Sequence, residues 1–291
     1  MKQENIQKIL ECMGIGQLPR SAVPFSAEED GSAYTVWKLE FADTVMVLKK
    51  TTRQERAVYE TFLLGFNAAP RCHGFCEIGD DVYMLMEFVP GRTLSRCTRE
   101  NLQLALDGLM ELQNAWWQDE NHADVGLSFD RCYESRCGWL PYMADLQPAF
   151  EDYLAAFRTV PRTLCNDDLL PFNVLSDGQR AVILDWEYGG ILPYPCALAR
   201  LIAYGEAQED ALFYMTREDK EFALQYYYDH LIREKGIDFR EYSRTMELFL
   251  LKEYAEWVYC AHKSGDLDIP YYQTYYPKAR ALADRLKGET P

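Results

Sequence analysis

The segment that most constrains this chain is residues 166–187. It opens with the polar sequence Asn-Asp-Asp-Leu-Leu-Pro-Phe-Asn and, after a turn, ends in a strand-like apolar run followed by Asp185. The pattern predicts a loop, a small hairpin and a strand end. Two acids and an amide, Asp168, Asn173 and Asp185, are therefore expected to lie close together.

This set of side chains suits phosphoryl transfer from ATP. One carboxylate can orient and deprotonate an acceptor hydroxyl, while an amide oxygen and a second carboxylate hold Mg²⁺ on the triphosphate. Asp168 lies five residues before Asn173, which is the spacing of a kinase catalytic loop. Asp185 then stands where the second metal-binding acid is expected.

The charge balance argues against several kinds of partner. The 291 residues include 30 Lys and Arg against 46 Asp and Glu, a formal net charge of -16. Such a chain repels nucleic acid and anionic lipid unless a basic patch intervenes, and the sequence has none. An acidic surface suits a cationic small molecule, although the same charge can serve solubility alone.

Other features of the sequence indicate a compartment. No apolar run approaches the roughly 20 residues of a membrane helix, and the N-terminus is polar rather than signal-like. The nine cysteines are scattered along the chain without a convincing set of metal ligands. We therefore expect a cytoplasmic protein with reduced thiols and no membrane association.

Strand patterns dominate the first third of the chain and helical patterns the rest. Alternating apolar residues predict strands at 34–40, 44–49, 72–78 and 82–88, with a helix at 53–64. Pro90-Gly91 ends this part. The chain is therefore expected to form a small α+β lobe, residues 1–88, joined to a larger, mainly helical lobe, residues 89–291. A cleft between the lobes is the expected ligand site.

Four motifs resemble the aminoglycoside phosphotransferase and choline/ethanolamine kinase superfamily, the small-molecule relatives of protein kinases. They are the loop at 166–175, Leu-Asp-Trp-Glu-Tyr at 184–188, Leu-Met-Glu-Phe-Val-Pro-Gly-Arg-Thr-Leu at 85–94, and Leu-Ala-Arg-Leu at 198–201. The resemblance implies a bilobal, protein-kinase-like α+β fold whose small N-terminal lobe holds an antiparallel sheet and one helix. It also implies ATP and Mg²⁺ as cofactors and a small-molecule acceptor.

The family's catalytic roles can be carried onto matching positions. Asp168 would be the catalytic base, because it, and not the adjacent Asp167, keeps the five-residue step to Asn173. Asn173 and Asp185 would bind Mg²⁺.

The resemblance also implies how the N-terminal lobe holds the nucleotide. Lys49, at the end of an alternating strand, would pair with the α- and β-phosphates. Glu55, at the head of the next helix, would hold Lys49, with Glu60 as the alternative. Ser32 lies between the first strands and would cover the phosphates. Backbone groups facing adenine are expected at Glu87, Phe88 and Val89.

The chain departs from the family pattern at three places. Asn166 stands where a histidine usually lies two residues before the catalytic acid. Residues 28–30 put three acids before the phosphate loop, and no acid precedes Leu198. These departures keep a second hypothesis open, a degenerate kinase-like protein that binds nucleotide without turnover.

The acceptor is the least constrained part of this interpretation. Carboxylates hold cationic amines, and aromatic faces hold quaternary ammonium groups. The sequence offers both in Glu187, Glu253 and Trp257, the last two on a predicted C-terminal helix. An aminoglycoside-like acceptor and a choline- or ethanolamine-like acceptor both fit this set. A sugar or homoserine-type acceptor stays an alternative.

Overall fold

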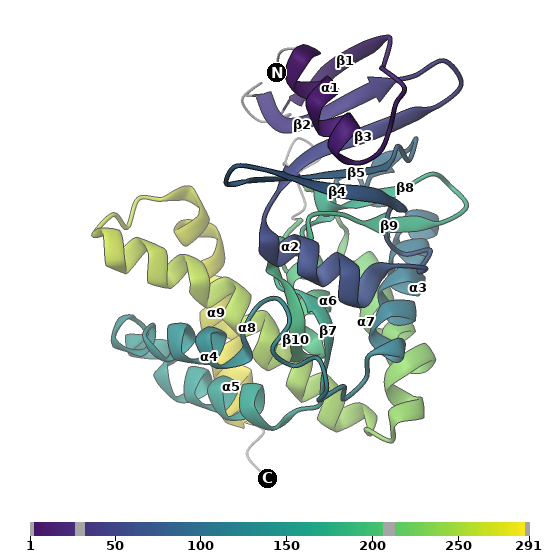
Figure 1. The fold of residues 1–291 in the computed structure, drawn as a ribbon. Coiled ribbons are helices and arrows are strands. Elements are labelled where there is room, and N and C mark those ends of the chain that lie inside the picture. Colours follow the sequence, from purple (N-terminus) through teal and green to yellow (C-terminus); the bar gives the residue numbers. More distant parts are fainter. Residues whose placement is uncertain (1–2, 27–32, 206–212, 289–291) are drawn as a thin grey trace.

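The structure, a computed structural model, describes residues 3–26, 33–205 and 213–288. Ser32, predicted to cover the phosphates, and the acidic residues 28–30 lie outside the described residues. Figure 1 shows a small lobe built around a sheet, placed above a larger and mainly helical lobe. This mixed, bilobal arrangement confirms the predicted fold class.

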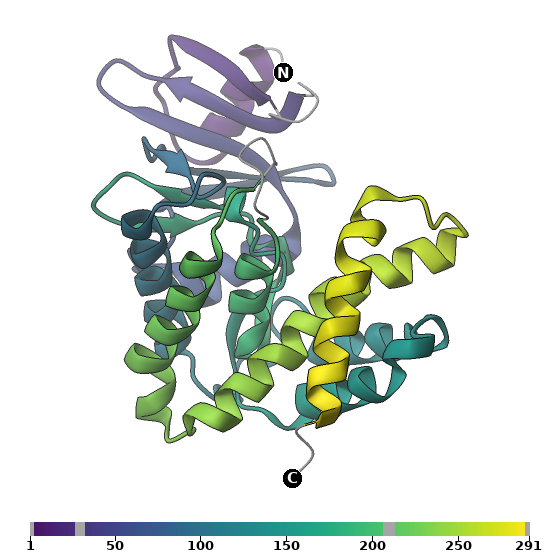
Figure 2. The same cartoon turned by 180° about the vertical axis from the view of Figure 1, so that it is seen from behind.

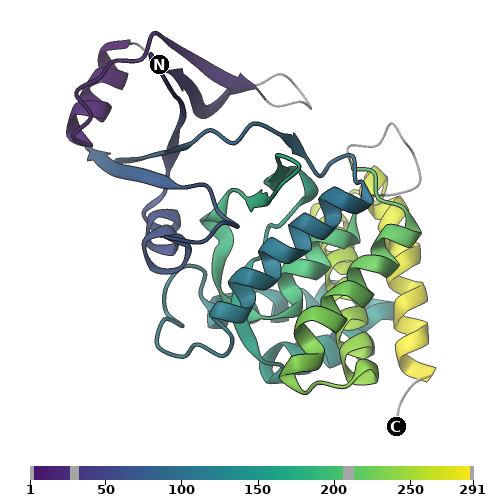
Figure 3. The same ribbon diagram turned by 90° about the vertical axis from the view of Figure 1, so that its right-hand side faces the viewer.

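The small lobe holds a five-stranded antiparallel sheet in the order β1-β2-β3-β5-β4. Its elements are α1 (Gln3–Cys12), β1 (Ser21–Ser26), β2 (Ala33–Glu40), β3 (Val45–Thr51), α2 (Arg53–Val58), β4 (Cys72–Ile78) and β5 (Asp81–Glu87). The two predicted hairpins and the helix after them are therefore present. In the side view of Figure 3, this sheet and α1 lie at one end of the molecule and the helices at the other.

The larger lobe is mainly helical with two small sheets. Its elements are β6 (Arg92–Thr93), α3 (Arg99–Ala115), α4 (Phe129–Cys137), α5 (Gln147–Thr159), β7 (Arg162–Asn166), β8 (Val174–Ser176), β9 (Ala181–Ile183), β10 (Gly189–Pro193), α6 (Pro195–Ala203), α7 (Arg217–Tyr227), α8 (Phe239–Ser264) and α9 (Pro270–Gly288). Seen from behind, α8 and α9 lie side by side (Figure 2). Strand β7 pairs with β10, and β8 pairs with β6 and β9. These short strands carry the predicted catalytic loop.

The two faces of the five-stranded sheet contact different parts of the protein. Trp37 of β2 and Leu48 of β3 are paired and form a small core with Ile6 and Leu10 of α1. Because side chains alternate along a strand, Lys49 points to the opposite face. The alternation of β3 thus directs Lys49 toward the larger lobe.

Helix α2 ties the two lobes together. Its first turn is capped by Thr52, whose hydroxyl accepts a hydrogen bond from the Glu55 N–H at 3.1 Å. The helix continues as a wider π-helical turn, Tyr59–Leu63. Val58 and Phe62 belong to the large core that the helical lobe shares with the inner face of the sheet. This core contains residues from both sides of position 88. The lobe boundary at that position stays a prediction. Because α2 packs into the shared core, the position of Glu55 is fixed relative to the larger lobe.

Two further findings concern the helices and the cysteines. None of the described helices has the length and apolar character that a membrane span requires. All nine cysteines are free.

Candidate active site

The predicted catalytic loop follows β7 and is closed by its own hydrogen bonds. The Asn173 side-chain nitrogen donates to the Asp168 carbonyl at 2.8 Å, and the Asn173 carbonyl accepts from the Leu184 N–H at 2.7 Å. Asn173 is buried, while the Asp168 side chain is 31% exposed. The loop therefore presents one carboxylate to solvent from a fixed backbone.

Asn166 joins this loop to the segment that carries the second acid. Its side-chain oxygen accepts from the Asp168 N–H at 3.0 Å, and its nitrogen donates to the Asp185 carbonyl at 2.9 Å. The side chain is fully buried. Asn166 thus supplies a structural link at the position where the family usually has histidine.

Asp185 occupies an unusual backbone conformation. Its φ of 55° and ψ of 68° lie in the left-handed region, which is uncommon for residues other than glycine and is often found at functional sites. The side chain is 49% exposed, and one carboxylate oxygen lies 2.7 Å from the Lys49 ammonium nitrogen. In this conformation the acid is exposed and contacts Lys49 of the five-stranded sheet.

Lys49 is held by a second carboxylate, that of Glu55, at 2.7 Å. The Glu55 side chain is only 2% exposed and also accepts from the Trp186 N–H at 3.0 Å and from the Thr51 hydroxyl. The alternative partner, Glu60, instead pairs with Arg56 on the helix surface. Of the two candidates, Glu55 is therefore the one that contacts Lys49.

The charge of Lys49 is secured by its neighbours. Burial lowers the pKa of this ammonium group, but the carboxylates of Glu55 and Asp185 together raise the pKa by a larger amount. The net shift of the Lys49 pKa is therefore upward. Lys49 thus remains a cation in a largely desolvated position, which suits contact with phosphate.

The two adjacent acids of the loop have different surroundings. Asp167 accepts two hydrogen bonds from the buried Arg136, at 2.7 and 2.8 Å. Burial raises the pKa of Asp167, but the charges of Arg136, Lys252 and Arg200 together lower it by more, so that the net shift is downward. For Asp168, burial raises the pKa and Arg200 only partly opposes this, so that the net shift is upward. Asp167 is thus engaged by the buried Arg136, and Asp168 is the more exposed of the two acids.

Sequence reasoning missed Arg200 as a contact of the site. This residue of α6 donates to one oxygen of Asp168 at 2.8 Å and to Glu253 and Glu256 of α8 at 2.9 and 3.0 Å. A signal was present, because an arginine inside the apolar sequence Leu-Ala-Arg-Leu-Ile requires a charged partner when that helix is buried. The partners themselves lie 32 to 56 residues away in sequence.

The three residues predicted to contact the acceptor have different positions. Glu253 is buried, and its two oxygens are engaged by Lys252 and Arg200 at 3.0 and 2.9 Å. The expectation for Glu253 is therefore not met, because burial and these cations withdraw it from solvent. Trp257 is half-buried and stacks on Tyr271, with ring centroids 4.3 Å apart.

Two other carboxylates are more accessible near the loop. Glu187 is half-buried. Its pKa is raised, mainly by burial and to a smaller extent by the negative charge of Asp185. Glu256 has a side chain that is 31% exposed and contacts the same guanidinium as Asp168. The accessible acids of this region are therefore Asp168, Asp185, Glu187 and Glu256.

The segment predicted to face adenine is held by side chains from both lobes. The Glu87 carboxylate accepts from the Arg71 N–H at 2.8 Å and from Arg180 at 2.7 Å. The Glu87 N–H itself donates to the Arg71 carbonyl at 2.9 Å, so that any contact of Glu87 with adenine would come from its carbonyl. Val89 is buried, and the ammonium of Lys38 lies 5.3 Å from the ring centroid of Phe88.

A metal ion here would depend on phosphate oxygens as well as on the protein. The described residues contain no group of three or more His, Cys, Asp or Glu that could hold a metal ion by itself. They do offer the half-exposed carboxylate of Asp185 and the side-chain oxygen of Asn173, whose nitrogen is engaged by the loop. Two hard oxygen donors suit Mg²⁺ that is bound together with a triphosphate.

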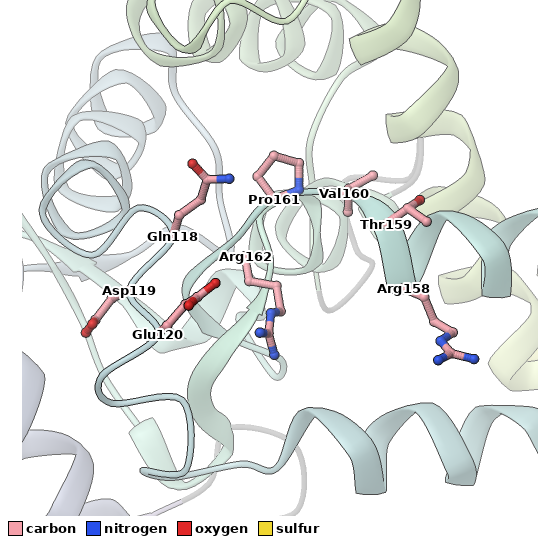
Figure 4. Close-up of a pocket in the computed structure, with 8 residues that line it drawn as sticks. All are labelled: Gln118, Asp119, Glu120, Arg158, Thr159, Val160, Pro161 and Arg162. Atoms are coloured by element: carbon pink, nitrogen blue, oxygen red, sulfur yellow. The ribbon is translucent and has the colours of Figure 1, made fainter.

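The pocket in Figure 4 lies elsewhere. Its volume is about 220 Å³, and it is lined by residues 118–120, which follow α3, and by residues 158–162, where α5 ends and β7 begins. None of the predicted site residues lines it. The candidate site is thus defined by converging side chains rather than by this cavity.

The fold and these side chains define a kinase-like phosphotransferase. The chain belongs to the phosphotransferase enzyme family, since a sequence model of that family matches residues 48–229. This match confirms the resemblance drawn from the four motifs. No curated protein matches the chain by sequence.

Solved structures of small-molecule kinases share the fold. A thermostable mutant of aminoglycoside phosphotransferase APH(4)-Ia, solved with ADP and hygromycin B, is 13% identical over 99% of both chains, with a TM-score of 0.61. Choline kinase from Cryptosporidium parvum is 12% identical over 92% of this chain and 90% of that one, with a TM-score of 0.59. Amicoumacin kinase, solved with AMP-PNP and Ca²⁺, is 12% identical over 100% and 97%, with a TM-score of 0.53. At these identities the three structures show that this chain shares their fold.

Proposed function

We propose that this protein transfers the γ-phosphoryl group of ATP to a hydroxyl of a small, cationic acceptor. The observation that carries the proposal is the bridging position of Lys49, 2.7 Å from both Glu55 and Asp185. These two contacts place the Lys49 ammonium group, which we propose binds phosphate, beside the half-exposed carboxylate of Asp185. Such an arrangement serves to position and neutralise a triphosphate.

In this proposal each residue of the chain has one task. Asp168 orients the acceptor hydroxyl and accepts its proton as the oxygen bonds to the γ-phosphorus and the bond to the departing ADP breaks. Lys49 holds the phosphates, and Glu55 holds Lys49. Asn173 and Asp185 would hold Mg²⁺, which would neutralise charge on the phosphates.

The cationic character of the acceptor is supported by charge. The accessible carboxylates of Glu187 and Glu256 lie beside the acids of the proposed chemistry, and the whole chain has a net charge of -16. A cation is attracted to such a surface and an anion is repelled. Hygromycin B and choline, named for two structural neighbours, indicate acceptor classes to test.

The proposal is tested by Mg²⁺-dependent phosphorylation with purified protein. Choline, ethanolamine and a set of aminoglycosides are offered with ATP, and products are identified by phosphorus NMR. Asp168→Asn serves as the inactive variant and Asp145→Asn, in a surface ion pair with Arg280, as the matched control. Acceptor-dependent product that is lost only in Asp168→Asn supports the proposal. Nucleotide binding without product for any acceptor favours the degenerate binding protein instead.

A further inference from the structure

We propose that Arg200 is a positioning residue that fixes the direction of the Asp168 carboxylate toward the acceptor hydroxyl. The inference rests on the proposed function, in which Asp168 is the base. Arg200 does not belong to the residues proposed to hold nucleotide, and its three acidic partners, Asp168, Glu253 and Glu256, differ from those of Lys49, which are Glu55 and Asp185. Its contact with Asp168 can instead orient the carboxylate of that residue.

The contact with Asp168 is directional. Both Nη2 and Nε of Arg200 lie near the same carboxylate oxygen, Oδ1, at 2.8 and 3.3 Å. In the part of the chain that the structure describes, no hydrogen bond engages the other oxygen, Oδ2. One oxygen is therefore held by the protein, and the second is left for the acceptor.

The guanidinium is itself anchored at its other end. Nη1 donates to Glu253 at 2.9 Å, to Glu256 at 3.0 Å and to the Tyr204 hydroxyl at 3.1 Å. Glu253 is buried and held in turn by Lys252. Because a guanidinium is planar and rigid, fixing Nη1 on α8 also fixes the donors that face Asp168.

A purely structural role explains this arrangement less well. An ion pair that is largely removed from water is often no more stable than apolar side chains of the same size. Here the Arg200 side chain is 14% exposed, and one of its three acidic partners is the half-buried Asp168 of the catalytic loop. A role in recruiting an anionic acceptor is also disfavoured, because three carboxylates already surround this cation.

Three variants test the proposal. Arg200→Ala removes the contact, and Arg200→Lys keeps the positive charge but not the planar fork. Arg244→Ala is the matched control, since Arg244 lies on α8, the helix that carries Glu253 and Glu256, and pairs with Asp152 of α5. For each variant we would measure kcat, KM for the acceptor, Kd for a nonhydrolysable ATP analogue, the ratio of acceptor phosphorylation to ATP hydrolysis, and the unfolding midpoint.

The expected result is a lower kcat with unchanged nucleotide affinity. In Arg200→Ala, kcat should fall by about 100-fold, as misplacement of a catalytic group by about 1 Å can cause, while Kd for the nucleotide is unchanged. The ratio of acceptor phosphorylation to hydrolysis should fall, because a misdirected base no longer selects the acceptor over water. Arg200→Lys should recover part of kcat, and added guanidinium ion below denaturing concentrations should restore part of the activity of Arg200→Ala.

Other results would overturn the inference. If folded Arg200→Ala keeps the wild-type kcat while Asp168→Asn is inactive, the inference fails alone and the proposed function stands. If activity is lost in proportion to the folded fraction, with no rescue by lysine or guanidinium, Arg200 is only structural. If the wild type phosphorylates no acceptor, the proposed function fails and the inference fails with it.

Discussion

The side chain of Asn166 donates to the backbone carbonyl of Asp185 at 2.9 Å while its oxygen accepts from the N–H of Asp168 at 3.0 Å. The buried side-chain amide of Asn166 therefore fixes the backbones of Asp168 and Asp185 relative to each other. The family usually has histidine at this position, and its replacement was a reason to consider a degenerate protein. The geometry favours an active site, because the link between loop and strand end is present without the histidine.

Replacing Asn166 by alanine should disturb the relative placement of Asp168 and Asp185. We expect kcat to fall by up to about 100-fold, with a smaller effect on the unfolding midpoint. Asn166→His should retain much more activity, because imidazole can donate to the same carbonyl. Steady-state kinetics of the two variants checks this. Equal activity of Asn166→Ala and wild type would mean that the amide link does not position the acids.

The contact between Lys49 and Glu55 can be tested by comparing two glutamates, Glu55 in α2 and Glu60 in its π-helical continuation. Glu55→Gln removes the buried carboxylate that holds Lys49, and affinity for an ATP analogue measured by titration calorimetry should fall by at least about tenfold, which corresponds to about 1.4 kcal/mol. Glu60→Gln removes a surface acid that pairs with Arg56, and affinity should stay within error of wild type. A reversed order of the two effects would contradict the assignment of Glu55.

Much of the arrangement of the candidate site could be predicted because its residues lie at fixed local spacing, while their roles stay a proposal. The step from Asp168 to Asn173, the strand end at Asp185 and the position of Lys49 on an alternating strand all depend on short-range geometry. The same holds for Glu55, which follows a capped helix start. Local sequence patterns of this kind determine local structure, and the order of motifs then determines which lobe each residue belongs to.

The missed or misjudged residues depend on contacts between distant parts of the chain. Arg200 contacts Glu253 and Glu256, more than fifty positions later. Glu253 was expected to contact an acceptor because a carboxylate beside Trp257 on a predicted C-terminal helix can hold a cationic amine. Helical periodicity, however, does not show which face the neighbouring α6 covers. Burial by α6 and pairing with Arg200 decided the outcome.

The protonation of Asp168 should set the acid limb of the pH profile. Burial, only partly opposed by Arg200, raises the pKa of this carboxyl above its ordinary value of 3.8. Because a base must be deprotonated to accept a proton, kcat/KM should fall as pH decreases through this raised pKa, at a higher pH than for an exposed aspartate. A pH–rate profile measured within the stable range checks the sign. An acid limb at or below 3.8 would contradict it.

Asp167 should matter for stability rather than for chemistry. Asp167→Asn leaves the buried Arg136 without its counter-charge, which should lower the free energy of unfolding by about 3 kcal/mol. The pKa of Asp167 is lowered in the folded protein from its ordinary value of 3.8. Its ion pair therefore stabilises fully above that value and is lost as pH falls through the lower, folded pKa.

Urea unfolding at neutral and acidic pH tests this role. Wild type should lose more stability than Asp167→Asn as pH falls, because the variant has no carboxylate to protonate at this position. Asp145→Asn, at an exposed ion pair with Arg280, should differ little from wild type. Equal stability of Asp167→Asn and wild type at neutral pH would show that the pair contributes nothing net.

The last prediction concerns the contact between α2 and β10. A Cβ on Gly189 would lie 2.8 Å from a ring carbon of Trp186 and 2.9 Å from a methyl group of Val58. Gly189→Ala should therefore cost about 2 kcal/mol of stability through overpacking. Val58 lies one turn after Glu55 on α2, so that displacing it should also weaken nucleotide binding. Gly16→Ala, where no atom lies within 4 Å of the added methyl, should change neither. Lower stability with unchanged nucleotide affinity in Gly189→Ala would mean that Glu55 is held by its own hydrogen bonds and not by the packing of α2 on the helical lobe.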